Sequence, residues 1–139
     1  MLSPFFFHSA CKALKFKPSV DLFANAAHHQ LPRYFTIDPR DRNAAGVNAF
    51  SVSWASEKRP YINPPWVLIS QVLQKIIAEK VTAMIVIHSW RNASWYELYE
   101  KLCAMDVEVN YAIYLDNAGH LRPNPWLNTR FGIVDGSRS

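Results

Sequence analysis

The chain is short of glycine and cysteine, and it has no long hydrophobic run. Its 139 residues include four glycines and two cysteines, Cys11 and Cys103. Two cysteines without metal-ligand spacing form no disulfide framework, so we expect free thiols in a reducing, intracellular compartment, cytoplasmic or nuclear. No stretch of 18 or more apolar residues occurs. We therefore expect no transmembrane helix and no membrane partner.

Acidic residues are absent from the first 20 positions, where Lys12, Lys15 and Lys17 follow the aromatic run at residues 5–7. A secretory signal carries its positive charge ahead of its apolar core, which is the opposite order. A mitochondrial presequence is normally rich in Arg, and this segment has none. We predict an N-terminal helix or arm over residues 1–18, with mitochondrial targeting as the alternative.

Length and composition indicate one domain over residues 1–139. Half of the residues are hydrophobic, which is enough for a real core. The net charge of +4 permits a polyanionic partner such as DNA. Arg33, Arg40 and Arg42 stand in a predicted loop region and are candidate nucleic-acid contacts; a plain solvated surface is the alternative.

Hydrophobic periodicity predicts alternating strands and helices. Strands are expected at residues 20–24, 61–62, 81–87, 107–115 and 129–134, and helices at 67–78 and from a capping box at 94–97 onward. Residues 25–60 are expected to be mostly loop, and residues 135–139 a frayed tail. This order predicts an α/β fold, a small Rossmann-like three-layer domain with a mainly parallel sheet.

Polar and aromatic residues follow three of the predicted strands. Asp21 and Phe23 end the first, Asn63 follows the second, and His88 with Trp90 ends the third. Ligands of parallel α/β sheets bind at the carboxyl ends of the strands. We therefore predict that Asp21, Asn63 and His88 lie at one edge of one sheet and border a shared site.

The tetrapeptide Asn63-Pro64-Pro65-Trp66 sits between a short strand and an amphipathic helix. Two prolines stiffen the loop, and Trp66 can stack on a base taken out of its helix. The Asn63 side-chain oxygen and the Pro64 carbonyl can both accept hydrogen bonds from an amine. The alternative is an ordinary stiff turn, with Asn63 capping the helix that follows.

These residues resemble the phage-type (Dam-like) DNA N6-adenine methyltransferases. The similarity is closer still to the methyltransferase-like domain of retroelement polyproteins. It is carried by residues 21–24 and 29–35, residues 48–51 with Trp54, residues 61–66, and the strand through Ile87 with Trp90, Trp95 and Tyr96.

The resemblance implies an abbreviated class I methyltransferase fold, S-adenosylmethionine as cofactor, and methyl transfer to adenine in DNA. It places Asp21, Phe23 and Asn48 at the cofactor and residues 63–66 at the adenine amine. Separately, Trp90 is a candidate nucleic-acid contact that can stack on a base, and an aromatic of the core or rim is the alternative. Three departures stand out. Asn48 replaces the usual Asp, Trp66 replaces the usual Tyr or Phe, and no Gly-rich turn follows Asp21.

Other kinds of site find little support. The adjacent His28 and His29 have no third ligand at metal spacing, so no metal site is expected. Three functions stay open: an adenine-N6 methyltransferase, a catalytically lapsed module that binds nucleic acid, and a structural subunit with protein partners, free or within a larger polyprotein.

Overall fold

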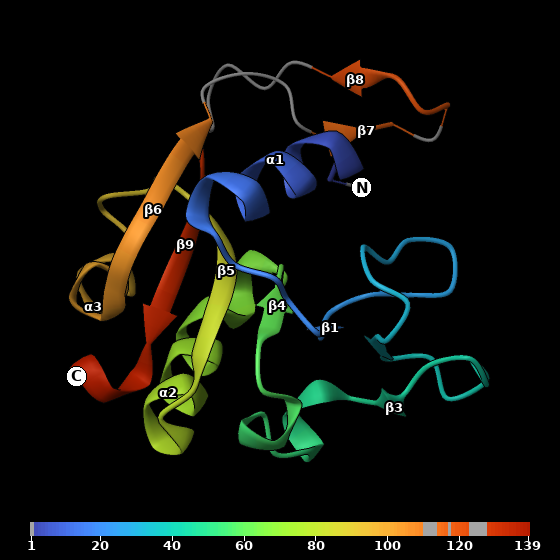
Figure 1. Cartoon of the computed structure of the whole chain (residues 1–139), viewed down its shortest axis with the longest axis horizontal. Helices are drawn as coiled ribbons and strands as arrows, with labels where there is room; N and C mark the ends of the chain where they lie inside the picture. Colours follow the sequence, from blue (N-terminus) through green and yellow to red (C-terminus); the bar gives the residue numbers. More distant parts are fainter. Residues whose placement is uncertain (1, 110–113, 117, 123–127) are drawn as a thin grey trace.

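A five-stranded sheet forms the centre of the computed structural model, which describes residues 2–109, 114–116, 118–122 and 128–139. Neighbouring strands follow the order β1-β4-β5-β9-β6 (Figure 1). Their bounds are Val20–Asp21 for β1, Pro60–Ile62 for β4, Thr82–His88 for β5, Thr129–Asp135 for β9 and Cys103–Val109 for β6.

The sheet is mainly parallel. Strands β1, β4 and β5 pair in parallel, with Asp21 beside Tyr61 and Ile62 beside Ile85. Strand β9 runs antiparallel between β5 and β6, so β6 points the same way as β5. The predicted common edge for Asp21, Asn63 and His88 is confirmed, because each lies at the carboxyl end of a parallel strand.

Helices cover both faces, which gives three layers. Helix α1 (Pro4–Leu14) lies on one face, and α2 (Ile69–Glu79) and α3 (Tyr96–Leu102) lie on the other (Figure 1). A hydrophobic core lies on each face of the sheet, and alternate residues of β5 pack into one or the other. Ile85 packs into the core under α2 and α3, and Met84 into the core under α1. The predicted Rossmann-like α/β fold is confirmed. No described helix is long and apolar enough to cross a membrane.

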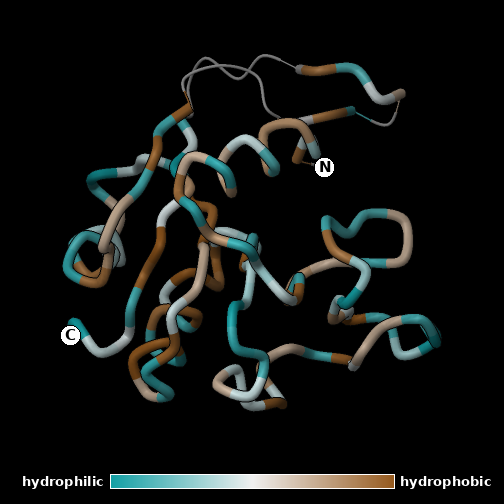
Figure 2. The backbone as a smooth tube through the Cα atoms, viewed as in Figure 1, coloured by the Kyte–Doolittle hydropathy of each residue, from teal (hydrophilic) through white to brown (hydrophobic). Residues whose placement is uncertain are grey.

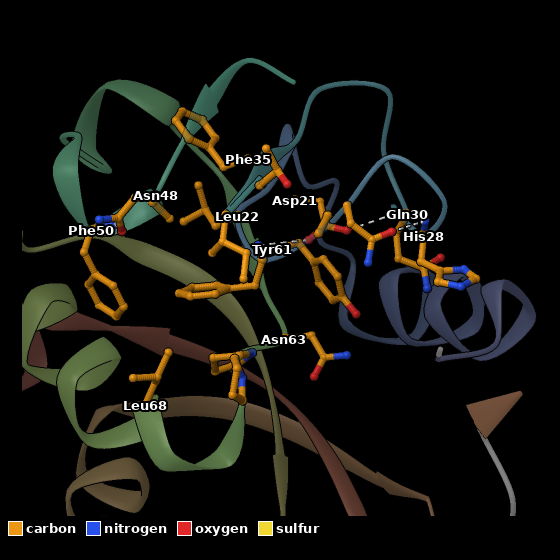
Figure 3. Close-up of a pocket in the computed structure, with 18 of the residues that line it drawn as sticks. Asp21, Leu22, His28, Gln30, Phe35, Asn48, Phe50, Tyr61, Asn63 and Leu68 are labelled. Carbon is orange, nitrogen blue, oxygen red and sulfur yellow. Dashed lines mark hydrogen bonds between the residues drawn. The ribbon is translucent and has the colours of Figure 1, made fainter. Parts of the chain in front are cut away.

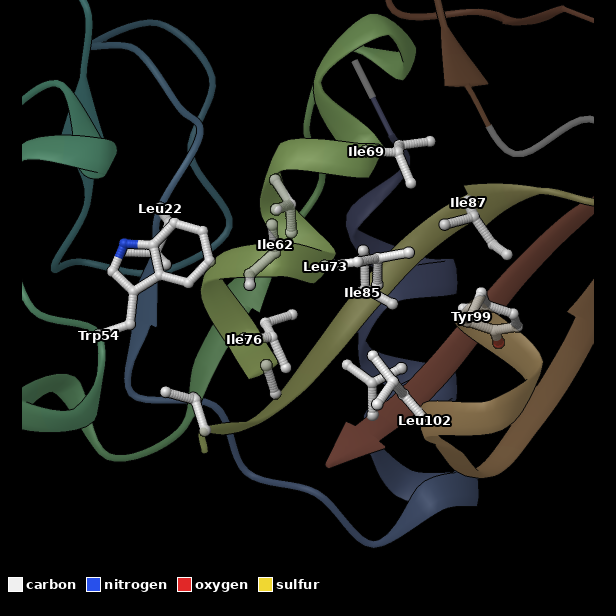
Figure 4. Packing of buried hydrophobic residues seen from close by; sticks show 14 of the residues in the cluster. Leu22, Trp54, Ile62, Ile69, Leu73, Ile76, Ile85, Ile87, Tyr99 and Leu102 are labelled. Atoms are coloured by element: carbon white, nitrogen blue, oxygen red, sulfur yellow. The ribbon is translucent and has the colours of Figure 1, made fainter. Parts of the chain in front are cut away.

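Helix α2 follows its hydrophobic spacing. Its buried residues Ile69, Val72, Leu73 and Ile76 recur every three or four positions and face the sheet (Figure 4). In Figure 2 hydrophobic and hydrophilic residues alternate along the turns of this helix. Each such side chain contributes about 1.5–3 kcal/mol through burial. The preceding residues form a 3₁₀ turn, η3 (Trp66–Leu68), because the stiff proline pair delays the α-helix.

Residues 25–58 form a lobe beside the sheet. The sequence predicts mostly loop here, and the structure adds the short parallel strands β2 (Phe35–Thr36) and β3 (Gly46–Val47). Two 3₁₀ turns follow, η1 (Ala49–Ser51) and η2 (Ala55–Glu57). Gly46 suits its place because a Cβ there would lie 2.6 Å from the Phe35 ring.

Several predicted boundaries differ from the structure. The strand expected at 107–115 becomes β6 and a separate β7 (Tyr114–Leu115), which pairs with β8 (Leu121–Arg122); residues 110–113 lie outside the described part. Helix α3 begins at Tyr96, and no side-chain hydrogen bond caps it, so the capping box does not form.

The predicted frayed tail instead forms a 3₁₀ turn, η4 (Gly136–Arg138). The Gly136 amide donates to the Val81 carbonyl at 2.9 Å. Gly136 is buried against the end of α2, where a side chain would collide with the Ile76 carbonyl oxygen. The absence of a side chain therefore lets the chain end dock.

Candidate functional site

A cavity of about 600 Å³ opens at the carboxyl ends of β1 and β4 (Figure 3). Its walls come from four places: the start of the chain at Leu2, the turn after β1, the lobe around β2 and η1, and the loop after β4. The volume falls within the range of small-molecule and cofactor sites, roughly 300–1,000 Å³. Six of the predicted site residues line it, namely Asp21, Phe23, Asn48, Asn63, Pro64 and Pro65.

Asp21 is a buried carboxylate at the wall of this cavity, only 3% exposed. Its Oδ2 accepts a hydrogen bond from the backbone amide of Gln30 at 2.9 Å (Figure 3). Its Oδ1 accepts a longer one from the backbone amide of Phe23 at 3.4 Å. Burial raises the pKa of Asp21 from 3.8 to about 6, although these amides and the nearby His29 act to lower it. The fold thus holds a carboxylate in a place that disfavours its charge.

The backbone around Asp21 is fixed from both sides. The Asp21 amide donates to the Arg33 carbonyl at 3.0 Å, and the Leu22 amide donates to the Tyr61 carbonyl at 3.1 Å. Strand β1 ends at Asp21, where the lobe begins. These backbone hydrogen bonds hold the Asp21 carboxylate at the wall of the cavity.

Three polar residues that the sequence analysis did not place at this site also line the cavity, namely Asn25, His28 and Gln30. Asn25 folds the turn, since its side-chain oxygen accepts from the Ala27 and His28 amides at 3.0 and 2.8 Å. The Gln30 side chain donates to the Leu2 carbonyl at 2.8 Å. Only the Asx turn at Asn25 could have been found from sequence, because the segment lacks periodicity.

The opposite part of the cavity is aromatic and apolar. Phe23 and Phe50 meet edge to face at 5.6 Å, and Phe35 and Leu68 also line the wall. Figure 3 shows Phe50 and Leu68 away from Asp21 and Gln30, so the cavity has a polar end and an apolar end.

Asn48 lies between the lobe and the cavity with a φ of 64°. Asn is among the residues that tolerate this left-handed region. Its side-chain oxygen accepts from the Phe50 amide at 3.1 Å and so starts η1. One of the two lone pairs of this oxygen is therefore already engaged.

Asn63 enters the cavity from the end of β4 (Figure 3). Neither η3 nor α2 is capped by a side chain, so the alternative of Asn63 as a helix cap is not what the fold uses. Within the described part of the chain, the Asn63 side chain has no hydrogen-bond partner. Pro65 is extended (φ −52°, ψ 138°), and its carbonyl accepts from the Leu68 amide at 2.9 Å.

Trp66 and Trp90 lie outside the cavity lining. Trp66 is 57% exposed and meets Trp90 edge to face at 5.5 Å. His88 stands 5.3 Å from the Trp90 ring, and burial lowers its pKa. We call Trp66, His88 and Trp90 the aromatic corner. They lie at the carboxyl ends of β4 and β5 or in the segments that follow these strands.

The three candidate arginines do not line the cavity. Arg33 makes a two-pronged ion pair with Glu57, at 2.8 and 2.9 Å. Arg40 pairs with Asp38 at 3.1 Å on the surface, and Arg42 is exposed. A second cavity of about 330 Å³ lies near α3 and β6, where Arg130 and the Tyr99 hydroxyl both donate to Asp106 at 3.0 Å.

Comparison with known proteins yields only distant likenesses. No family model matches the chain, and no curated protein matches it. One similar structure is the precorrin 8w decarboxylase of Methanobacterium thermoautotrophicum, with 9% identity, a TM-score of 0.47, and 91% of this chain and 89% of that chain covered. Another is the precorrin-6y C5,15-methyltransferase of Geobacter metallireducens, with 10% identity, a TM-score of 0.42, and 85% and 82% covered. At this level of similarity, function has to be inferred from the chain's own side chains.

Proposed function

We propose that this chain is an S-adenosylmethionine-dependent methyltransferase whose acceptor is an exocyclic amine, the N6 amine of adenine in DNA. One observation carries the proposal. The same cavity is lined by the buried Asp21 carboxylate and by the Asn63 side-chain amide, which has no hydrogen-bond partner among the described residues. Both lie at the carboxyl ends of parallel strands.

The two ends of the cavity suit the two ends of this cofactor. Asp21 and Gln30 offer oxygen acceptors to the ammonium group of its methionine part, and Phe23 and Phe50 offer aromatic surface to its adenine ring. The cofactor supplies an electrophilic methyl group on a sulfonium. With a pKa of about 6, Asp21 is mostly ionised at neutral pH and can attract that positive charge.

Asn63 and Pro64 would orient the acceptor amine. The lone pair of an exocyclic amine is delocalised into the ring, so the nitrogen must become more tetrahedral before it attacks. Oxygen acceptors aimed at its two hydrogens, the Asn63 side chain and the Pro64 carbonyl, favour that geometry. Trp66 and Trp90, at the same edge, would stack on the base and its neighbours.

A second candidate is a lapsed methyltransferase that binds nucleic acid without transferring a methyl group. It is favoured by Asn48, which stands where the resembled family has Asp and whose oxygen is already bound to the Phe50 amide. This candidate keeps the cavity and the aromatic corner but loses a carboxylate contact to the cofactor.

Methyl transfer from labelled S-adenosylmethionine to single- and double-stranded DNA separates the two candidates. For an active enzyme, Asn63→Ala should lower the rate about a hundred- to a thousandfold with cofactor affinity nearly unchanged. Asn43→Ala, in an exposed part of the lobe outside the cavity lining, is the matched control. Cofactor binding without any transfer by the parent protein would favour the lapsed module. Full activity of Asn63→Ala would remove Asn63 from the mechanism.

A further inference from the structure

The wall of the cavity formed by residues 48–50 belongs to a segment with little regular structure. Residues 48–58 contain only η1 and η2, and most of their side chains are exposed or half-buried. Yet Asn48, Ala49 and Phe50 all line the cavity. Something outside the segment has to hold it in place.

Glu79, in the last turn of α2, reaches across to this segment. Its Oε1 accepts hydrogen bonds from the Trp54 amide at 2.9 Å and the Ser53 hydroxyl at 3.0 Å, with the Ala55 amide at 3.4 Å. Its Oε2 pairs with the Lys75 ammonium at 2.6 Å. Burial acts to raise the pKa of Glu79, but these hydrogen bonds outweigh it and leave the pKa below its ordinary value.

Trp54 connects this carboxylate to the cavity. The indole is fully buried between the lobe and α2 (Figure 4). Its Nε1 donates to the Ala49 carbonyl at 2.8 Å, and its ring packs against Phe50 at 5.8 Å and Phe23 at 6.5 Å. The Lys75 ammonium lies 5.3 Å from the same ring. Contacts therefore run without a break from Glu79 through Trp54 to the cavity wall.

We propose that Glu79 is a positioning residue for this cavity: it holds the wall at residues 48–50 in its ligand-binding shape, although it does not line the cavity itself. The ligand, S-adenosylmethionine, rests on the proposed function. The ordering of the wall does not, because the hydrogen bonds of Glu79 and Trp54 lie within the protein and are present without a ligand.

A carboxylate is required at this position. One Glu79 oxygen collects donors from the lobe while the other faces an ammonium, so both must be acceptors. Glutamine has the same size but no charge, and its amide N–H₂ must face either the lobe donors or the Lys75 ammonium, so one set of contacts is lost and the other is weakened. Glu79→Gln should therefore release the lobe from α2 without opening a cavity. Lys75→Met removes only the ammonium and should release it less.

Hydrogen exchange of the ligand-free protein tests the wall directly. In Glu79→Gln, the Trp54 indole N–H and the Phe50 amide should exchange about tenfold faster or more, while amides of β5 and α3 keep their protection. Glu97→Gln, an exposed change on α3 on the other side of the molecule from β3 (Figure 1), should alter neither group. Unchanged exchange at Trp54 and Phe50 would overturn the proposal. So would equal acceleration throughout the sheet, which indicates global destabilisation.

Cofactor titration of the folded variants supplies the second readout. S-adenosylmethionine should bind Glu79→Gln about tenfold more weakly or worse, and Glu97→Gln like the parent protein. Equal affinity in Glu79→Gln would refute the positioning role. If the parent protein binds no cofactor, the proposed function fails, and the exchange experiment still decides whether Glu79 holds the wall.

Discussion

Asp21→Asn should stabilise the ligand-free protein at neutral pH. The substitution keeps the shape of a side chain that is 3% exposed but removes its charge. The asparagine oxygen can still accept from the Gln30 amide, now 2.9 Å from Oδ2; only the longer contact to the Phe23 amide is lost. The dominant change is therefore the relief of a buried negative charge.

The expected size follows from the pKa of Asp21, about 6 in the fold against the ordinary 3.8. That difference corresponds to about 3 kcal/mol, an upper value because one hydrogen bond is weakened. Because the folded pKa is raised, the fold favours the protonated acid. The loss of unfolding free energy caused by the buried charge is absent below pH 3.8, grows as the pH rises toward 6, and is constant above that.

Urea denaturation of both proteins between pH 3.5 and 8 measures this difference. The gain in unfolding free energy of Asp21→Asn over the parent should rise from near zero at the acid end to a plateau above pH 6. Asp38→Asn is the control, since the pKa of that exposed carboxyl is lowered by its hydrogen bonds with Arg40. It should give no such gain. A difference for Asp21→Asn that does not change with pH would refute the reasoning.

Three further changes have outcomes that denaturation measures. Leu73→Ala empties a fully buried position on α2 and should cost about 2–5 kcal/mol; a loss below 1 kcal/mol would contradict the packing. Gly136→Ala should lower the melting temperature clearly, because its Cβ collides with the Ile76 carbonyl; an unchanged value would mean that η4 is not docked. Arg33→Gln should change stability by about 1 kcal/mol or less, because the Arg33 side chain is 53% exposed and solvent screens its pair with the less exposed Glu57; a larger loss would show a structural role.

Hydrophobic periodicity predicted much of the fold. The continuous apolar run at 81–87 became β5, and the spacing at 69, 72, 73 and 76 became the buried face of α2. Because parallel strands share one edge, the sequence also placed Asp21 and Asn63 together. These features depend on local pattern and on a rule of sheet geometry.

The rest depends on contacts between distant residues. Periodicity does not give strand order, so the insertion of β9 between β5 and β6 was not foreseen. Nor does it show that Gly136 lets the end of the chain dock on α2. The Gln30 backbone amide donates to the Asp21 carboxylate, and the Glu79 carboxylate accepts from the Trp54 backbone amide. Such partners leave no mark in sequence spacing.

Calorimetric titration with S-adenosylmethionine tests the central claim, that the cavity beside Asp21 and Asn63 binds this cofactor. The parent protein at pH 7.5 should show one binding site, and Asp21→Asn should bind about ten- to a hundredfold more weakly, because a charge-assisted contact is lost. Asn63→Ala should bind like the parent. No binding by the folded parent protein, or equal affinity in Asp21→Asn, would contradict the claim.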